Sequence, residues 1–378
     1  SYGVQGNDNI YLPGEDQERS YTPYMSLYEI SSDGKNPGLK PQYKGNRAIT
    51  WEESGNFNVG VETTFWDNRI NLDIDFFYKK TNNLLFNMPI PASTGFTTEP
   101  RNVADMKNQG VELPLGVPPV KTDNFSWKLT FNGLHYKNEI TRLPEELREK
   151  GVSRSKKYQI LKEGGSIYDF YMVKWGGVNP ENGDAQYWIK NPTTGEFELK
   201  PSAAYESVNS VQNVGSAIPD LQGGFGTTFN FYNFELALQF AYQMGGKFFD
   251  SQYLGLMHSG TAGHNWHTDI RNRWTPENRN TDVPRLQGNS QNIVAASDRF
   301  LIDASYLSLR NVSLAYNFSK EVVEKLRLSQ LRYYITADNV WLWSKRKGLD
   351  PRVSLDGNNT YAVNSPIRTV SMGLSFTF

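Results

Sequence analysis

The end of the chain carries the sequence pattern that most restricts its fold. Residues 368–378 alternate between apolar and small polar side chains without a break, and Phe378 is the last residue. A strand of this kind suits either the wall of a soluble β-sandwich or a barrel with lipid outside and water inside. An exposed aromatic residue at a soluble sheet edge would invite aggregation. The fold therefore depends on which solvent meets the apolar face.

Composition excludes several classes of protein. The 378 residues include 39 basic and 40 acidic side chains, so a nucleic-acid partner, which needs a clustered basic excess, is not expected. Cysteine is absent, which excludes disulfides and thiol catalysis. No run approaches the 18 apolar residues of a membrane-spanning helix. The low mean hydropathy of −0.59 still allows a membrane barrel, because half of each barrel strand and all loops meet water.

The alternation of the last strand recurs along the chain and predicts an all-β fold. Residues 234–244 show it most regularly, with Phe, Leu and Tyr on one side and Glu, Ala and Gln on the other. Most of these runs reach the roughly 9–11 residues that a tilted membrane strand needs. The nine predicted strands cover residues 55–65, 70–80, 106–118, 125–137, 221–231, 234–245, 303–318, 330–341 and 367–378.

The connections between these strands alternate in length. The short ones are 66–69, 119–124, 232–233 and 319–329, and the long ones are 81–105, 138–220, 246–302 and 342–366. Short turns at one end and long loops at the other are typical of an outer-membrane barrel. We therefore expect a transmembrane antiparallel β-barrel over 51–378, with long extracellular loops and short periplasmic turns. Residues 1–50 are predicted to be an extracellular loop region, with a possible short strand at 21–29.

Aromatic residues and the strand number extend this prediction. An interfacial girdle is expected at the short-turn end, where many aromatic side chains fall. Nine strands leave open edges and form an odd number, so we expect the chain to be the C-terminal part of a larger barrel. The predicted girdle residues are Phe65, Trp66, Phe125, Trp127, Phe231, Tyr232, Phe234, Phe318, Phe376 and Phe378.

Several short motifs are weak alone but specific in their order and spacing. They are Trp51-Glu52-Glu53, Asn56-Phe57-Asn58-Val59-Gly60, Asn108-Gln109-Gly110-Val111-Glu112-Leu113, residues 173–184, Arg273-Trp274-Thr275-Pro276, Asp282-Val283-Pro284-Arg285, residues 305–312, Asp338-Asn339 and Gly348-Leu349-Asp350-Pro351. Through them, from Trp51 to Phe378, the chain resembles the C-terminal barrel portion of SusC/RagA-type TonB-dependent transporters of the Bacteroidetes. Asn179, Asp338 and Pro114 depart from the usual pattern of that family.

The resemblance implies a 22-stranded plugged barrel in the outer membrane of a Gram-negative bacterium. The plug and the segment that contacts the TonB-ExbB-ExbD complex are expected outside this chain. The implied partners are a SusD-like lipoprotein lid, outer-membrane lipid and the barrel-assembly machinery, which would read the C-terminal strand. The implied activity is energy-coupled import of oligosaccharides, without an enzymatic step or a cofactor. Import of peptides, a passive porin and a soluble glycan-binding β-protein are the alternatives.

Aromatic residues of the 138–220 loop are the candidates for substrate binding. Flat rings pack on the apolar faces of sugars, and binding pockets combine such surfaces with a few polar groups. The preferred alternative is that these side chains pack the loop against its neighbours or a lid protein. The candidates are Tyr168, Tyr171, Trp175 and Trp188.

Other possible sites are better explained without chemistry. His258, His264 and His267 share one loop, but without cysteine or a carboxylate pair they indicate a variable surface and no metal site. Residues 179–184 resemble a calcium loop only faintly, and a β-hairpin over 186–196 is the better interpretation. No catalytic motif is present. The charged strand residues are interpreted as a hydrated lumen wall, namely Glu62, Asp73, Asp75, Glu112, Lys128, Glu235 and Arg332.

Overall fold

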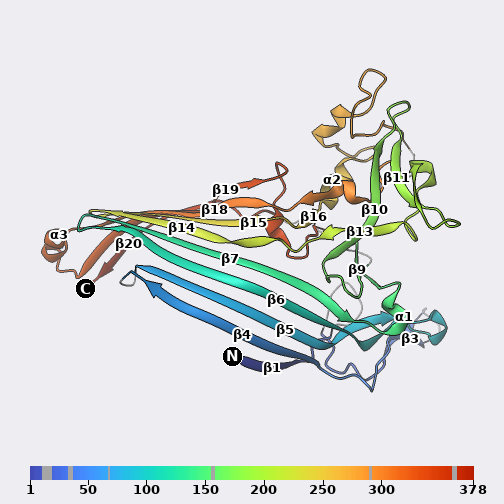
Figure 1. The fold of residues 1–378 in the computed structure, drawn as a ribbon, viewed down its shortest axis with the longest axis horizontal. Coiled ribbons are helices and arrows are strands. Elements are labelled where there is room, and N and C mark those ends of the chain that lie inside the picture. The colour runs from blue at the N-terminus through green and yellow to red at the C-terminus, as the bar shows by residue number, and fades with distance from the viewer. Residues whose placement is uncertain (11–18, 33–36, 67–68, 155–157, 289–291, 360–363) are drawn as a thin grey trace.

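The protein forms a curved ten-stranded antiparallel sheet that carries a large loop assembly at one end (Figure 1). The computed structural model describes residues 1–10, 19–32, 37–66, 69–154, 158–288, 292–359 and 364–378. Across the sheet the strands are β1 (Tyr2–Asn7), β4 (Glu52–Phe65), β5 (Ile70–Pro89), β6 (Thr98–Lys121), β7 (Phe125–Arg142), β14 (Leu221–Phe231), β15 (Phe234–Met244), β18 (Tyr306–Asn317), β19 (Gln330–Ser344) and β20 (Thr369–Thr377).

The register of the sheet collects the apolar side chains on its outer face. One row runs through Phe229, Leu236, Leu314, Ile335 and Met372, which are direct neighbours on five successive strands. These side chains meet no described element, since Leu314 is 46% and Met372 75% exposed. A sandwich would cover such a face with a second sheet. The prediction of a transmembrane barrel wall is confirmed, and the soluble sandwich is wrong.

Aromatic residues gather at the short-turn end of the sheet, as predicted. Phe231 pairs directly with Phe125 and Phe234, and Phe234 pairs with Tyr316. The helix α3 (Lys320–Lys325) lies in the connection after β18 at the same end (Figure 1). Among the described residues, no helix is long and apolar enough to cross a membrane. A row of aromatic side chains therefore marks this edge of the wall.

The long loop predicted over 81–105 is wrong. β5 and β6 run through most of that range, and only residues 90–97 connect them, with a 3₁₀ turn at Ala92–Thr94. Breaks in the β5–β6 register near Thr81 and Leu84 disturb the alternation, so the pattern fades before the strands end. The second half of β5 is stabilised by burial of Leu84 against Ile140 and Leu161, which lie far away in sequence.

The first fifty residues contain more strand than predicted. β1 pairs with β4 and adds a tenth strand to the nine predicted ones. A separate hairpin of β2 (Leu27–Ser32) and β3 (Pro37–Tyr43) overlaps the strand expected at 21–29 only in part. β1 has only six residues, two of them Gly, and its side chains are exposed. Such a short, unburied strand shows little apolar alternation, which explains why the pattern missed it.

Pro114 interrupts one ladder of β6 without shifting its register. Leu115 pairs with Leu72 and Glu112 with Asp75, while Leu113 and Pro114 have no partner on β5. On the other side, Pro114 keeps its place opposite Asn132 of β7. Because proline has no N–H to donate, a local gap in the ladder is the expected result.

The long connections fold into a second β-structure. The segment between β7 and β14 begins with α1 (Glu145–Arg148) and forms six strands, which pair in the order β12-β11-β10-β9-β8 with β13 also on β10. They are β8 (Val152–Arg154), β9 (Gln159–Leu161), β10 (Asp169–Val178), β11 (Ala185–Lys190), β12 (Phe197–Pro201) and β13 (Val211–Ser216), with a 3₁₀ turn at Ser202–Ala204. This small sheet stands beyond the end of the barrel wall (Figure 1).

The two later connections pack beside this small sheet. The second long connection, between β15 and β18, contains β16 (Lys247–Phe249), α2 (Ser251–Leu256), β17 (Leu301–Asp303) and 3₁₀ turns at Thr268–Asn272 and Asp298–Phe300. The third long connection, between β19 and β20, contains a 3₁₀ turn at Pro351–Val353. β16 pairs with β17, and Phe249 bridges Asn358. The three connections are called the loop assembly below.

Candidate functional site

A cavity of about 1040 Å³ lies on the concave face of the sheet, below the loop assembly. Side chains from seven strands of the wall reach it, and the loops add the rest of its lining. Amide and phenol groups dominate the wall, and both types bind hydroxyl groups and amides. They are Asn56, Asn58, Asn108, Gln222, Gln243, Tyr136, Tyr168 and Tyr306.

Charged side chains of both signs line the cavity. Asp75 and Glu112 lie directly opposite each other on β5 and β6 and form two neighbouring carboxylates. Lys79 also lines the cavity from β5, and Lys247 and Arg310 line the side formed by β18 and the loop assembly. Like charges that face each other across strands repel, so the two carboxylates favour a cation or a donor group nearby. The prediction that charged strand residues face a lumen is confirmed for Asp75 and Glu112.

Arg352 and Asp350 form a buried ion pair at the rim of the cavity. Nε and Nη2 of Arg352 donate to the two carboxylate oxygens of Asp350 at 2.8 and 2.7 Å, and Nη1 donates to Ser308 at 2.8 Å. Burial works to raise the pKa of the Asp350 carboxyl, but the hydrogen bonds from Arg352 outweigh it and leave that pKa below its ordinary value. All three guanidinium nitrogens of Arg352 thus donate hydrogen bonds within the protein.

The loop assembly has a hydrophobic core of its own. Phe170 and Met172 of β10 are fully buried against Phe249, Met257 and Phe300, which come from the next long connection. Apolar contacts of this kind stabilise a fold by roughly 1.5–3 kcal/mol for each fully buried large side chain. The connections are therefore one packed body, and they do not behave as separate loops.

Trp175 belongs to a second core of the same body. Its ring lies 5.3 Å from that of Tyr187, and the guanidinium of Arg299 lies 4.8 Å from the ring centre. Its backbone N–H donates to the Asp298 carboxylate at 2.6 Å. Burial raises the pKa of that carboxyl, although this hydrogen bond opposes the effect. Trp175 is thus surrounded by protein contacts, as the packing alternative expects.

The structure separates the other three predicted residues. Tyr168 lines the large cavity, and its ring packs beside the first core. Burial raises the pKa of the Tyr171 hydroxyl, and a hydrogen bond with Asn213 of β13 offsets part of this rise. Trp188 is 37% exposed on β11, opposite Leu199, and lies outside the cavity lining. Of the four candidates, only Tyr168 is brought to the cavity.

The faint calcium motif is a tight turn between β10 and β11. Asn179 N–H donates to the Asp184 carbonyl at 2.8 Å, and the side-chain oxygens of Asn179 and Asn182 accept from N–H groups two residues on. Gly183 has φ of +72°, and a Cβ there would lie 2.5 Å from the Trp274 ring. The predicted hairpin is confirmed as β11 and β12, and the turn before it, between β10 and β11, is the seat for Trp274.

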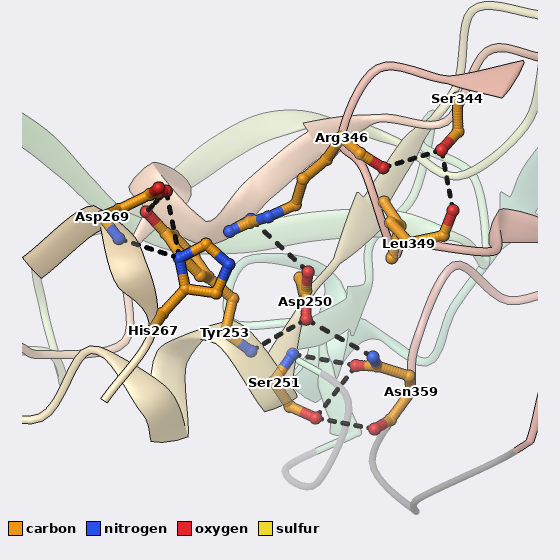
Figure 2. Close-up of polar contacts among 9 residues, drawn as sticks. All are labelled: Asp250, Ser251, Tyr253, His267, Asp269, Ser344, Arg346, Leu349 and Asn359. Atoms are coloured by element: carbon orange, nitrogen blue, oxygen red, sulfur yellow. Dashed lines mark hydrogen bonds and ion pairs between the residues drawn. The ribbon is translucent and has the colours of Figure 1, made fainter. Parts of the chain in front are cut away.

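A polar clasp joins the second and third long connections (Figure 2). Asp250 accepts from the Tyr253 N–H at 2.9 Å, and its other oxygen lies 3.4 Å from Arg346. The guanidinium carbon of Arg346 lies 3.1 Å from the centre of the Tyr253 ring. The backbone N–H and the hydroxyl of Ser251 donate to oxygens of Asn359 at 2.6 to 2.9 Å. These contacts tie the second and third long connections to each other.

The three histidines of the second connection have ordinary structural contacts. His258 stacks on Trp266 at 5.0 Å and lies 5.9 Å from His264, ring centre to ring centre. His267 packs against Tyr253 in the clasp and lies 3.3 Å from Asp269 (Figure 2). Within the described residues, no group of three or more His, Asp or Glu side chains could hold a metal ion.

Known proteins share this architecture. Residues 18–340 match the family model described as TonB dependent receptor-like, beta-barrel. A solved structure of the RagAB peptide transporter superposes on the whole chain with a TM-score of 0.83 and 24% sequence identity, and the match covers 40% of that chain. The likeness to this structure supports the fold of the barrel wall and of the loop assembly.

Sequence relatives agree with the family match. TonB-dependent receptor P3 of Formosa agariphila is 29% identical over 398 residues, and TonB-dependent receptor SusC of Bacteroides thetaiotaomicron is 25% identical over 384. The chain spans about 39% and 35% of these two proteins. Proteins of this family are receptors and transporters of the outer membrane, and they are not enzymes. The match covers most of the chain, which therefore belongs to the TonB-dependent receptor-like β-barrel family.

Proposed function

We propose that this chain is part of an energy-coupled importer that carries oligosaccharides across the outer membrane. The long-loop end faces outside the cell and the short turns face the periplasm. The TonB-ExbB-ExbD complex supplies the energy through a part of the protein outside this chain, and a SusD-like lipoprotein closes the cavity. The barrel-assembly machinery inserts the wall by way of β20.

The lining of the large cavity is the observation that carries this proposal. Five amide side chains and three tyrosines surround a space of about 1040 Å³, which is large enough for a short oligomer. Amides donate to and accept from sugar hydroxyls, and phenol rings offer flat apolar faces with a polar edge. Tyr168 is the predicted aromatic residue in this lining, so it is proposed to contact substrate. Trp175 packs against the second core of the loop assembly instead.

Peptide import is the second candidate. The cavity holds both signs of charge, with Asp75, Lys79 and Glu112 on β5 and β6 and with Lys247 and Arg310 on the side formed by β18 and the loop assembly. A short peptide carries both charges at its termini, so it complements this arrangement better than a neutral sugar does. The RagAB transporter, which has the same fold, is a peptide transporter by name.

Binding measurements on the full-length protein separate the two candidates. Calorimetry with neutral oligosaccharides and with short peptides should give binding for the oligosaccharides, and Tyr168→Ala should weaken it by roughly tenfold, as loss of a central contact does. Trp188→Ala is the matched control, because Trp188 lies outside the cavity. Binding of peptides alone would replace the glycan proposal with the second candidate. Equal effects of the two variants would move recognition away from this cavity.

A further inference from the structure

Arg310 enters the cavity through a break in the register of β18. Gln239 of β15 pairs with Asn311 and Phe240 pairs with Leu309, so Arg310 has no partner on that strand. An extra residue of this kind is a β-bulge, which bends a strand and re-aims a side chain. Arg310 is exposed, and it lines the cavity.

The bulge also keeps the membrane face of β18 intact. Leu307 and Leu309 on one side of it, and Val312 and Leu314 on the other, all pair with outward apolar residues of β15. The first two positions are odd and the last two even, so the pattern changes phase between them. Without one extra residue, half of the strand would turn its apolar side chains into the lumen. The bulge is therefore a consequence of the sequence, and Arg310 is the residue that it inserts.

Side-chain hydrogen bonds hold this irregular backbone in place. Asn311 donates to the Asp338 carboxylate of β19 at 2.8 Å. Asn339, which follows Asp338 on β19, has a left-handed backbone with φ of +52°, and its side-chain amide donates to the Ile367 carbonyl at 3.0 Å. Asparagine accepts this conformation more readily than most residues. The base of Arg310 is thus fixed on both sides.

The guanidinium of Arg310 itself is free of partners. It makes no hydrogen bond or ion pair with any residue in the part of the chain that the structure describes. Arg352, which lines the same cavity, differs because Asp350 and Ser308 occupy its nitrogens. An arginine on a fixed base, with its planar fork open to a cavity, matches a carboxylate in two parallel hydrogen bonds.

We propose that Arg310 is an anion-binding residue of the lumen and that its ligand is a carboxylate. The carboxylate belongs either to the transported molecule, such as a uronic acid or a peptide C-terminus, or to another segment of the full-length protein that occupies the lumen. The first source rests on the proposed function, because it takes the cavity to be the transport path. The second source does not depend on it.

The test uses the full-length protein and the variants Arg310→Gln and Arg310→Lys. Calorimetry compares two pairs of probes: tetragalacturonate with its methyl ester, and a tetrapeptide acid with its amide. If the ligand is substrate, Arg310→Gln weakens binding of the acid in a pair by about 10- to 100-fold and leaves the uncharged probe unchanged, with Arg310→Lys intermediate. Lys320→Gln is the control, since it removes the same charge from the exposed turn end.

Thermal unfolding without any probe tests the second source. If the carboxylate belongs to the protein, Arg310→Gln lowers the unfolding temperature and increases proteolysis of the lumen segment, while the selectivity between the probes stays as in the wild type. If Arg310→Gln behaves like Lys320→Gln in both measurements, the proposal is wrong. If the wild type binds neither sugar probe, the peptide pair and the unfolding measurement judge Arg310, while binding of neutral oligosaccharides separately judges the glycan proposal.

Discussion

The barrel wall and the loop assembly direct their apolar side chains in opposite ways. In the wall, Leu314 and Met372 point outward and are exposed, whereas Phe170 and Phe300 in the loop assembly are fully buried. The wall thus satisfies its backbone through the strand ladder and leaves its apolar face for lipid. The loop assembly must exclude water by itself, as a soluble domain does. The same chain therefore turns apolar side chains toward lipid in the wall and packs them against each other in the loop assembly.

Removal of a core ring is expected to have the largest effect, and only in the loop assembly. Phe170→Ala should cost about 3–5 kcal/mol, because it leaves a cavity in a core of seven buried apolar residues. Hydrogen exchange should show lost protection in 158–217 and 247–288 and unchanged protection in β14 and β15. Phe225→Ala, on the outer face of β14, is the control and should have little effect on either region. Lost protection in both regions would show that wall and loops are one cooperative unit.

A charge on the outer face should affect only the wall. Leu238 lies four positions along β15 from Phe234 in the girdle, which is about 10 Å along the membrane normal for a strand tilted by about 40°. Leu238→Arg should therefore cost about 2–4 kcal/mol. Gln239→Arg, which points to the lumen, should cost much less. Denaturant unfolding in lipid vesicles measures both, and equal costs would contradict the assignment of the two faces.

Acid should loosen the rim of the loop assembly before it affects the wall. Because the folded pKa of Asp350 is lower than its ordinary value of 3.8, the ion pair with Arg352 contributes fully above pH 3.8 and is lost as the pH falls through the folded pKa. Hydrogen bonds to a charged group contribute about 1.5–3 kcal/mol. Cleavage by pepsin near Pro351 should rise below pH 3.8. In Asp350→Asn it should be high and nearly independent of pH, and a wild type that resists cleavage at all acid pH values would contradict this role.

Substitution of a turn glycine is expected to have the smallest effect on stability. Comparing two such glycines separates backbone strain from displacement of Trp274. Gly183 and Gly195 both have a left-handed backbone, with φ of +72° and +75°, but only Gly183 lies against another residue, Trp274. Alanine at either position should cost about 1–2 kcal/mol through the backbone. Only Gly183→Ala should also displace Trp274 and increase hydrogen exchange in 273–285. Identical exchange in the two variants would show that this turn does not seat Trp274.

Local patterns predicted the wall better than the site. Alternation located nine of the ten sheet strands, and loop lengths identified the turn end, because both depend on neighbours in the sequence. The same alternation carried a signal that was not used, the change of phase between Leu309 and Val312, which predicts the bulge at Arg310. The aromatic candidates were less predictable, since Trp175 and Tyr168 share one loop but differ in what surrounds them.

The sequence by itself determined which strands have an apolar face, because side chains alternate with a period of two along any strand. Together with the alternation of short and long connections, these faces predicted a membrane barrel. Only the tertiary structure decided how the loops pack, which aromatic residues are buried and which reach the cavity. Those outcomes depend on contacts such as that between Tyr187 and Asn292, which are 105 residues apart. Contacts at such a distance leave no periodic trace in the sequence around either residue.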